Sequence, residues 1–245
     1  MNERQKLQLS MLRELDEIAS RHGIPYYLAY GTALGAIREK GFIPWDLDVD
    51  VYVKYDDYEF LCEKLKKELS EDYSVVWYKY DKRYDFLMAR ICPMGVDHHN
   101  MHIDLFPLVG APSEESEQKR FVKITYLVHR LFYVKQLDSF LLHRSPKIKL
   151  LVSLLVKVPL LLVPSELLIR LHEKLCTKYP VDESEFFHSA CGSYGIREIV
   201  PKAFIGSGKR VSFEGIDLLA PQLLHEYVSQ IYGPDYLTPK RNNYI

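Results

Sequence analysis

Apolar residues at the start of the chain recur every three or four positions, which is the spacing of one face of an amphipathic helix. These residues are Leu7, Met11, Leu15 and Ile18. Gly23 and Pro25 predict the end of this helix, because glycine and proline disfavour its continuation. The apolar run 24–30 then predicts a strand that enters a turn at Gly31, followed by a short helical turn over 33–38.

The clearest strand pattern of the chain covers residues 47–53, where acidic and aliphatic residues alternate. Successive side chains of a strand point to opposite faces, so Leu47, Val49 and Val51 are expected to face a core. The opposite face then carries three carboxylates, those of Asp46, Asp48 and Asp50.

The rest of the chain divides into a strand-rich part and a helix-rich part. An amphipathic helix is expected over 56–69, with Asp56 as its N-cap. Three further strands are predicted at 73–78, 86–92 and 101–106. From about residue 114 the pattern is helical and interrupted by prolines, and it ends in short strands, loops and a helix over 221–231. This order predicts an α/β or α+β fold with a helix-rich C-terminal half.

Composition limits the classes of function. The 245-residue chain carries 32 basic and 33 acidic residues, so its net charge of −1 provides no basic field for nucleic acid. Its four cysteines form no C-x-x-C pair, which favours reduced thiols over disulfides or a zinc knuckle. The charged N-terminal segment lacks the apolar stretch of a signal peptide, so we expect a cytoplasmic protein.

The alternating acids suggest a metal site. Two carboxylates about 7 Å apart along a strand can converge on Mg²⁺ or Mn²⁺, which prefer oxygen ligands. A lone pair of such acids is more often a solvated strand face. Here Asp104 lies on another predicted strand and adds a third carboxylate to Asp48 and Asp50. The sequence therefore predicts Asp48, Asp50 and Asp104 as metal ligands.

Residues upstream of these acids suit a phosphate group. Gly31 allows a close backbone approach, and the hydroxyl of Thr32 can bind a phosphate oxygen. Arg38 and Lys40 add positive charge nearby.

The order of these motifs resembles the nucleotidyltransferase fold and, more narrowly, the LicD family of phosphocholine transferases, relatives of the fukutin-type sugar phosphotransferases. Three blocks carry the resemblance: YGTALGAIREKGFIPWDLDVDVYV (30–53), HIDLFPLVG (102–110) and FEGIDLLAP…LHEYVSQIYGPDYLTP (213–239). Leu47 departs from the family, where another acid is common at this position. If Leu47 faces the core, the metal pair stays intact. The resemblance implies a nucleotidyltransferase-like mixed sheet flanked by helices.

The resemblance also implies an activity. Family members transfer a phospho-alcohol, typically phosphocholine from CDP-choline, to a sugar hydroxyl of a cell-surface glycan precursor and release CMP. The expected partners are thus CDP-choline or a related CDP-alcohol and a glycan or lipid-linked glycan acceptor, as in lipopolysaccharide or teichoic acid synthesis. Mg²⁺ or Mn²⁺ held by the catalytic residues Asp48, Asp50 and Asp104 would neutralise the diphosphate. One of these carboxylates, or Asp46, would accept the proton of the acceptor.

The same resemblance implies a set of substrate-binding residues: Gly31, Thr32, Gly35, Arg38, Trp45 and Asp46. Arg90 is a further candidate for stabilising negative charge, although a structural salt bridge explains it as well. Trp45 with Tyr26, Tyr27 and Tyr30 would form a cation–π pocket for choline, or these aromatic residues simply pack in the core.

Two other functions are compatible with the motifs. A nucleotidyltransferase that moves a nucleoside monophosphate onto a small acceptor would use the same acids, and only its products would differ. A binding or scaffold protein would be expected to have lost an acid, yet Asp48, Asp50 and Asp104 are all present.

The segment DHHNMH, residues 97–102, offers two adjacent histidines. Neighbours on a strand point to opposite faces, and no cysteine accompanies His98 and His99. We therefore interpret the segment as a polar loop rather than a transition-metal site. His102 shares a strand face with Asp104 and either lines the site or is an ordinary strand residue.

An apolar run over 150–163 is interrupted by Ser153, Lys157 and Pro159. It is too short and too broken to span a bilayer. Flanking basic residues suit a peripheral contact with the inner membrane face through 143–171, and a buried helical pair is the alternative.

Three regions are expected along the chain. Residues 1–110 would form the nucleotidyltransferase-like catalytic core, and 111–185 a helical region. Residues 186–245 would form the C-terminal part of the same domain and pack on the core.

Overall fold

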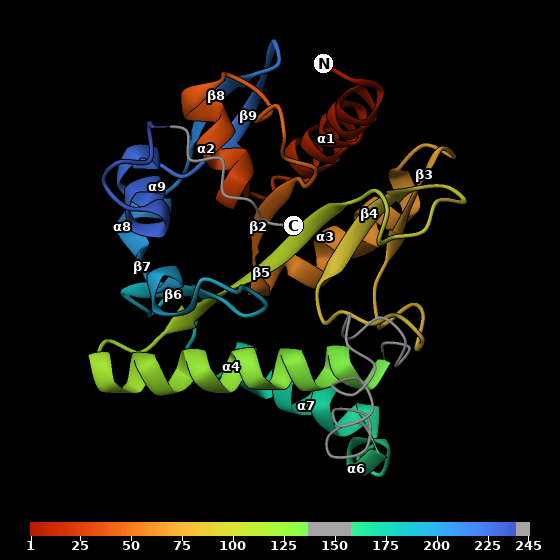
Figure 1. The fold of residues 1–245 in the computed structure, drawn as a ribbon, viewed down its shortest axis with the longest axis vertical. Coiled ribbons are helices and arrows are strands. Elements are labelled where there is room, and N and C mark those ends of the chain that lie inside the picture. Colours follow the sequence, from red (N-terminus) through yellow and green to blue (C-terminus); the bar gives the residue numbers. More distant parts are fainter. Residues whose placement is uncertain (137–157, 239–245) are drawn as a thin grey trace.

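The chain folds as a mixture of helices and strands in the computed structural model, which describes residues 1–136 and 158–238 (Figure 1). The helices are α1 (Glu3–Arg21), α2 (Tyr30–Arg38), α3 (Tyr55–Glu68), α4 (Glu115–Gln136), α6 (Val158–Leu161), α7 (Ser165–Cys176), the 3₁₀ helix η3 (Gly195–Glu198), α8 (Lys202–Ile205) and α9 (Leu224–Tyr232). The strands are β1 (Tyr26–Leu28), β2 (Asp50–Lys54), β3 (Tyr73–Val76), β4 (Ala89–Pro93), β5 (Ile103–Ala111), β6 (Phe186–Ser189), β7 (Val200–Pro201), β8 (Lys209–Phe213) and β9 (Ile216–Ala220).

One mixed sheet of seven strands organises the described part of the chain. Its strands follow the order β1–β2–β5–β4–β3, while β6 pairs with both β5 and β7. Strands β2 and β5 are parallel, and the other pairs are antiparallel. The pair β8–β9 forms a separate antiparallel hairpin. This sheet with its flanking helices confirms the predicted mixed α/β fold class.

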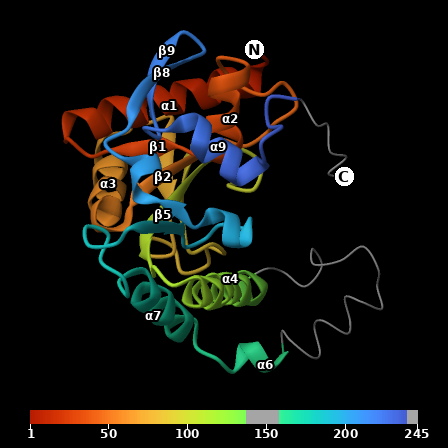
Figure 2. The same cartoon turned by 90° about the vertical axis from the view of Figure 1, so that its left-hand side faces the viewer.

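The two faces of β2 are covered differently, and Figure 2 shows α3 and α9 on opposite sides of it. Tyr52 points toward α2 and α9, because its ring contacts the rings of Tyr30 and Tyr227. Val51 and Val53 therefore point to the other face, where they are fully buried. On that side α1 and α3 pack together and contact β5. One face of β2 is thus aliphatic and the other aromatic and polar.

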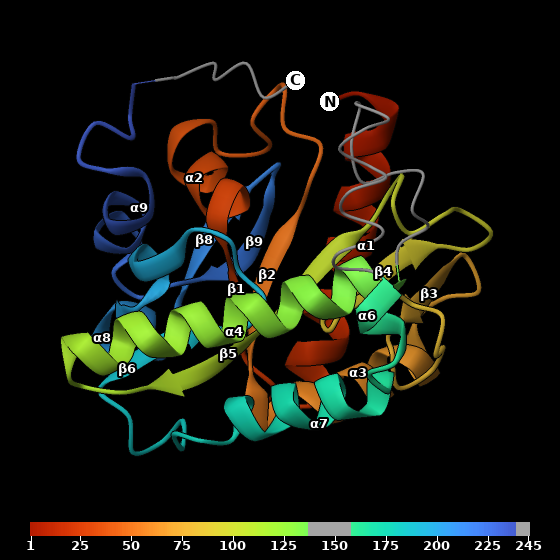
Figure 3. The same cartoon turned by 60° about the horizontal axis from the view of Figure 1, so that its bottom comes forward.

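Helices α4 and α7 form a second layer. They lie side by side beneath the sheet in Figure 1, and Figure 3 shows α4 crossing in front of β5 and β6. The hydroxyl of Thr125 on α4 lies 2.9 Å from Nε2 of His188 on β6, and this buried contact links the layer to the sheet.

The strand predicted over 47–53 begins only at Asp50. Residues 46–49 form an irregular segment, and the carbonyl oxygen of Leu47 accepts hydrogen bonds from Arg4 and Gln8 of α1 at 2.9 and 2.8 Å. The side chain of Leu47 is 56% exposed, so the prediction that it faces the core is wrong. Strand alternation does not apply here because the backbone before Asp50 is anchored to α1 instead of the sheet.

Several predicted boundaries also shift. The helix expected from residue 33 begins at Tyr30, so Gly31 and Thr32 lie in its first turn and not in a separate turn. Helix α3 begins at Tyr55 after Lys54, and no side chain caps it, so Asp56 is not the N-cap. Strand β4 starts at Ala89 instead of residue 86.

No helix in the described ranges, 1–136 and 158–238, is long and apolar enough to cross a bilayer. Most of the apolar run 150–163 and the basic residues before it lie outside the described residues. In the described remainder, Leu161, Leu162 and Leu167 are exposed.

A buried tyrosine joins α3 to the central strands, and its removal is expected to destabilise the fold. The Tyr58 hydroxyl donates to the carbonyl oxygen of Leu105 on β5 at 2.5 Å and accepts from the N–H of Ala89 on β4 at 2.7 Å. Tyr58→Phe leaves both buried backbone groups without this partner. The free energy of unfolding should fall by about 1–3 kcal/mol, measured by urea denaturation.

Tyr84→Phe is the matched control. The Tyr84 hydroxyl is also buried but has no hydrogen-bond partner among the described residues. Its removal should leave the unfolding free energy unchanged or slightly higher. Equal losses in the two variants would contradict the bridging role of Tyr58.

Candidate functional site

Two aspartates lie opposite each other at the start of neighbouring parallel strands. In the β2–β5 register, Asp50 pairs with Asp104. Adjacent strands are about 4.8 Å apart, and residues in register point to the same face of the sheet. The two carboxylates therefore emerge side by side on the aromatic, polar face of β2.

Asp46 and Asp48 reach the same place from the irregular segment before β2. Together with Asp50 and Asp104, they line a cavity of about 320 Å³. The sequence prediction that these acids converge is confirmed in this respect, but the route differs: Asp46 and Asp48 extend from a loop, not from a strand.

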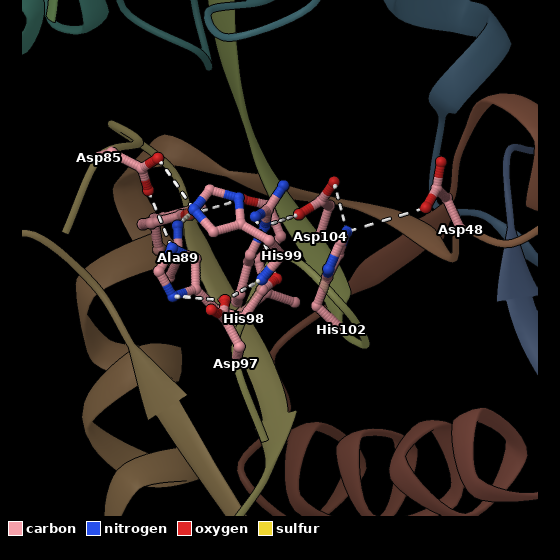
Figure 4. Close-up of polar contacts among 11 residues, drawn as sticks. Asp48, Asp85, Ala89, Asp97, His98, His99, His102 and Asp104 are labelled. Carbon is pink, nitrogen blue, oxygen red and sulfur yellow. Dashed lines mark hydrogen bonds and ion pairs between the residues drawn. The ribbon is translucent and has the colours of Figure 1, made fainter. Parts of the chain in front are cut away.

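Asp104 is held by two basic side chains, and Figure 4 shows one of them, His102, beside it. It is 7% exposed, and the Nε–H of Arg90 on β4 donates to its Oδ1 at 2.5 Å. His102 Nε2 lies 3.6 Å from Asp104 Oδ2 and 3.9 Å from Asp48 Oδ1, so the imidazole stands between the two carboxylates. Arg90 thus makes a buried salt bridge, which is one of the two roles expected for it.

The two strand acids differ in electrostatic state. Burial, followed by the charges of Asp104, Asp48 and Asp46, raises the pKa of Asp50 well above its usual range. Burial also acts to raise the pKa of Asp104, but the Arg90 guanidinium and His102 outweigh it and hold that pKa below its usual range. Burial raises the pKa of Asp46 as well.

These groups fit a hard divalent cation. The carboxylate of Asp50 makes no hydrogen bond or ion pair within the described residues, although acids surround it. A partly buried carboxylate in this position needs a positive partner. The donor set consists of carboxylate oxygens, which suit Mg²⁺ or Mn²⁺.

The first turn of α2 lies next to the acidic cavity and contacts the segment that carries Asp46 and Asp50. Thr32 is buried, and its Oγ1 accepts the backbone N–H of Asp50 at 2.9 Å, which fixes the point where β2 begins. Gly31 lines the cavity, and a Cβ atom there would come within 2.3 Å of Asp46 Oδ2. Glycine at this position therefore leaves room for the carboxylate of Asp46.

Thr32 does not line the cavity, and three other residues expected to bind substrate also lie outside its lining. A Cβ atom on Gly35 would come within 2.4 Å of the Gly41 carbonyl oxygen, so this glycine permits close chain packing. The Arg38 guanidinium lies 5.9 Å from the Trp45 ring centre, and its Nε donates to Glu39 at 3.0 Å. Trp45 itself is 46% exposed.

An aromatic wall completes the cavity, and most of it was missed in the sequence. It consists of Tyr30, Phe106, Tyr194 and Tyr232. Tyr194 stacks on Tyr30 with ring centres 5.2 Å apart, and Phe106 contacts Tyr30 edge to face at the same distance. Of these four residues, the sequence motifs indicate only Tyr30. The short motif CGSYG (191–195), after β6, was the available signal for Tyr194, while Phe106 and Tyr232 lie within the quoted blocks 102–110 and 213–239.

Tyr30 is locked in place by buried polar contacts. Its φ of +42° lies in the left-handed region that side chains rarely adopt. Its N–H donates to the Tyr227 hydroxyl at 3.0 Å, and its own hydroxyl donates to Glu198 at 2.6 Å. Burial raises the pKa of Glu198 to about 7. By contrast, Tyr26 and Tyr27 belong to the buried core and do not line the cavity.

Comparison with known proteins indicates the family of this chain. The model of the LicD/FKTN/FKRP nucleotidyltransferase domain matches residues 23–153, which include β2, β5 and all four cavity acids. The lipopolysaccharide cholinephosphotransferase LicD of Haemophilus influenzae is 27% identical over 253 residues, covering 97% of this chain and 91% of that protein. The mouse ribitol 5-phosphate transferase FKRP is 32% identical over 89 residues, 35% of this chain and 17% of that protein.

These matches agree with the resemblance predicted from the motifs and with the mixed sheet. The family match covers more than half of the 245 residues. The chain therefore belongs to the LicD family, with its LicD/FKTN/FKRP nucleotidyltransferase domain, and is a phosphotransferase enzyme of the LicD type.

Proposed function

We propose that the protein transfers phosphocholine, or a similar phospho-alcohol, from a CDP-alcohol to a sugar hydroxyl of a cell-surface glycan precursor. CMP is the second product. The observation that carries this proposal is the convergence of Asp46, Asp48, Asp50 and Asp104 on one cavity. The relatives named for cholinephosphate and ribitol phosphate transfer support the class of donor.

Asp48, Asp50 and Asp104 would hold the divalent cation, Mg²⁺ or Mn²⁺. When bound there, such an ion neutralises the diphosphate of the donor and favours departure of the nucleotide. Other residues of the chain hold these ligands in position before a cation binds. Arg90 keeps Asp104 ionised, while Thr32 fixes the backbone of Asp50.

The remaining acid, Asp46, is assigned to proton transfer. Burial raises its pKa, which makes it a better proton acceptor than a solvated aspartate. In the proposed reaction the acceptor hydroxyl gives its proton to Asp46 while its oxygen attacks the phosphorus that carries the alcohol. A new P–O bond forms to the sugar, and the bond between the two phosphates breaks to release CMP.

The aromatic wall supports choline as the alcohol. A trimethylammonium group is attracted to aromatic faces, and Tyr30, Tyr194 and Tyr232 line the cavity beside the acids. Of the choline pocket expected from Trp45, Tyr26, Tyr27 and Tyr30, only Tyr30 lines the cavity, and Tyr194 and Tyr232 take the place of the others in this proposal. A lipid-linked glycan is the proposed acceptor, and exposed Leu161, Leu162 and Leu167 would support a peripheral membrane contact.

Removal of the cavity acids is expected to abolish the reaction. Full-length protein with CDP-choline, Mg²⁺ and a membrane glycolipid extract should release CMP, and EDTA should stop the release. Asp48→Asn, Asp50→Asn and Asp104→Asn should each lower kcat by at least about 10²-fold, because charge on the diphosphate is no longer neutralised. Asp72→Asn, an exposed aspartate on another part of the surface, is the matched control and should retain full activity.

Product analysis separates this reaction from nucleotidyl transfer. CMP from a CDP-alcohol supports the proposal, with CDP-ethanolamine, CDP-glycerol and CDP-ribitol tested beside CDP-choline. Pyrophosphate from CTP, with no CMP from any CDP-alcohol, would show a nucleotidyltransferase instead. CMP release that persists in all three acid variants would contradict the assigned site.

Loss of an aromatic side chain from the cavity is expected to weaken binding of the choline headgroup and of no other part of the donor. Tyr194→Leu removes a ring that lines the cavity and stacks on Tyr30. Because a cation–π contact contributes about 0.5–2 kcal/mol, KM for CDP-choline should rise about 2- to 30-fold. KM for CDP-glycerol, which carries no cation, is the internal control and should change little. An equal rise for both donors would mean that the ring only shapes the cavity.

A further inference from the structure

A second group of potential metal ligands lies beside the acidic cavity and is not used by the proposed transfer. It consists of Asp85, His98 and His99, whose ligand atoms all lie within 4.8 Å of one another. Figure 4 shows the two imidazoles facing the Asp85 carboxylate, away from Asp48.

The segment forms the polar loop predicted from the sequence, but its geometry removes the objection raised there against a metal site. Adjacent histidines cannot share one face of a strand, but residues 97–100 form a turn closed by the Asn100 N–H donating to the Asp97 carbonyl oxygen at 2.8 Å. The turn brings both rings to one side, with centres 4.2 Å apart. His98 Nε2 lies 2.9 Å from one oxygen of Asp85, and His99 Nε2 lies 3.2 Å from the other.

The two separations from Asp85 are close to the edge length of a metal coordination shell. With metal–ligand bonds of about 2.0–2.1 Å and tetrahedral angles, neighbouring ligand atoms are roughly 3.3 Å apart. Two imidazole nitrogens and one carboxylate oxygen favour Zn²⁺ or a related transition metal, whereas Mg²⁺ prefers oxygen ligands. A fourth position would remain for water.

The charge of Asp85 also calls for a cation. Its side chain is only 7% exposed, and its ion-pair partners within the described ranges are His98 and His99. Two neutral imidazoles would leave this carboxylate uncompensated in a buried position. A divalent ion shared by the three groups would supply the missing charge and remain compatible with neutral histidines.

Surrounding residues hold the ligands in place. The Asp97 carboxylate accepts the backbone N–H of His99 at 2.8 Å and lies 3.8 Å from His98 Nδ1, the ring nitrogen turned away from Asp85. Metal-binding histidines commonly have a carboxylate on their other ring nitrogen. Phe86 packs against both imidazoles on the adjacent side.

We propose that Asp85, His98 and His99 bind one divalent transition-metal ion, of which Zn²⁺ is the expected example, at a site separate from the acidic cavity. This ion would have a structural and positioning role. The His98 carbonyl oxygen accepts a hydrogen bond from Arg90 Nη1 at 3.2 Å, and Arg90 in turn holds Asp104. Ordering the turn would therefore fix the arginine that keeps Asp104 in place.

Direct binding of Zn²⁺ tests the proposal without any measurement of activity. Metal-free full-length protein is titrated with Zn²⁺ by competition with a chromophoric chelator, and Co²⁺ is added separately to record its visible absorption. The wild-type protein should bind one Zn²⁺ at this site and give the intense absorption of tetrahedral Co²⁺. His99→Gln should weaken that binding at least about 10- to 100-fold, and His98→Ala/His99→Ala should weaken it further.

Matched variants separate this site from others. His225→Ala, at an exposed histidine bonded to Tyr236, should leave binding unchanged. Asp48→Asn/Asp50→Asn should also retain it, because the acidic cavity is a different site. His99 is partly exposed, so His99→Gln should fold normally, and its circular dichroism and urea midpoint verify this.

Three results would overturn the proposal. The first is the absence of stoichiometric Zn²⁺ binding to the wild-type protein, which would mean that the three residues form a metal-free ion network. The second is equal affinity in wild type and the histidine variants. The third is loss of binding in Asp48→Asn/Asp50→Asn but not in His99→Gln, which would place the ion in the acidic cavity.

Discussion

The structure depends on how four carboxylates are kept together in one cavity. Asp50 and Asp104 stand opposite each other on parallel strands, and Asp46 and Asp48 line the same space. Only Arg90 directly neutralises one of them by a close salt bridge within the described residues. The resulting repulsion is unfavourable in the free protein, and attraction to the proposed divalent ion would offset it.

The surrounding fold maintains this arrangement. The Thr32 hydroxyl accepts the N–H of Asp50, and Gly31 leaves space for the carboxylate of Asp46. The aliphatic face of β2 is anchored by α1 and α3, while the tyrosines of α2 and α9 cover the other face. Hydrogen bonds around Tyr30 hold its unusual backbone conformation next to the acids.

The sequence predicted the part of the site that follows strand periodicity. Asp50 and Asp104 were each placed on a strand because alternation and an aliphatic opposite face are local signals, whereas the pairing of the two strands is seen only in the folded chain. The irregular segment before β2 was misread as strand, since contacts of Leu47 with Arg4 and Gln8 are not visible in the local pattern. The aromatic wall escaped notice for the same reason: Tyr194 and Tyr232 are distant in sequence from the acids and reach them only through the folded chain.

We propose that Asp48, Asp50 and Asp104 bind the cation that contacts the donor diphosphate. A crystal structure with Mn²⁺ and CDP-choline, with anomalous scattering measured at the manganese edge, tests this claim most directly. We expect manganese between Asp48, Asp50 and Asp104, in contact with diphosphate oxygens, and the trimethylammonium group against Tyr30 and Tyr194. A diphosphate bound in this cavity without manganese on these carboxylates, or manganese and donor bound at separate places, would contradict the account.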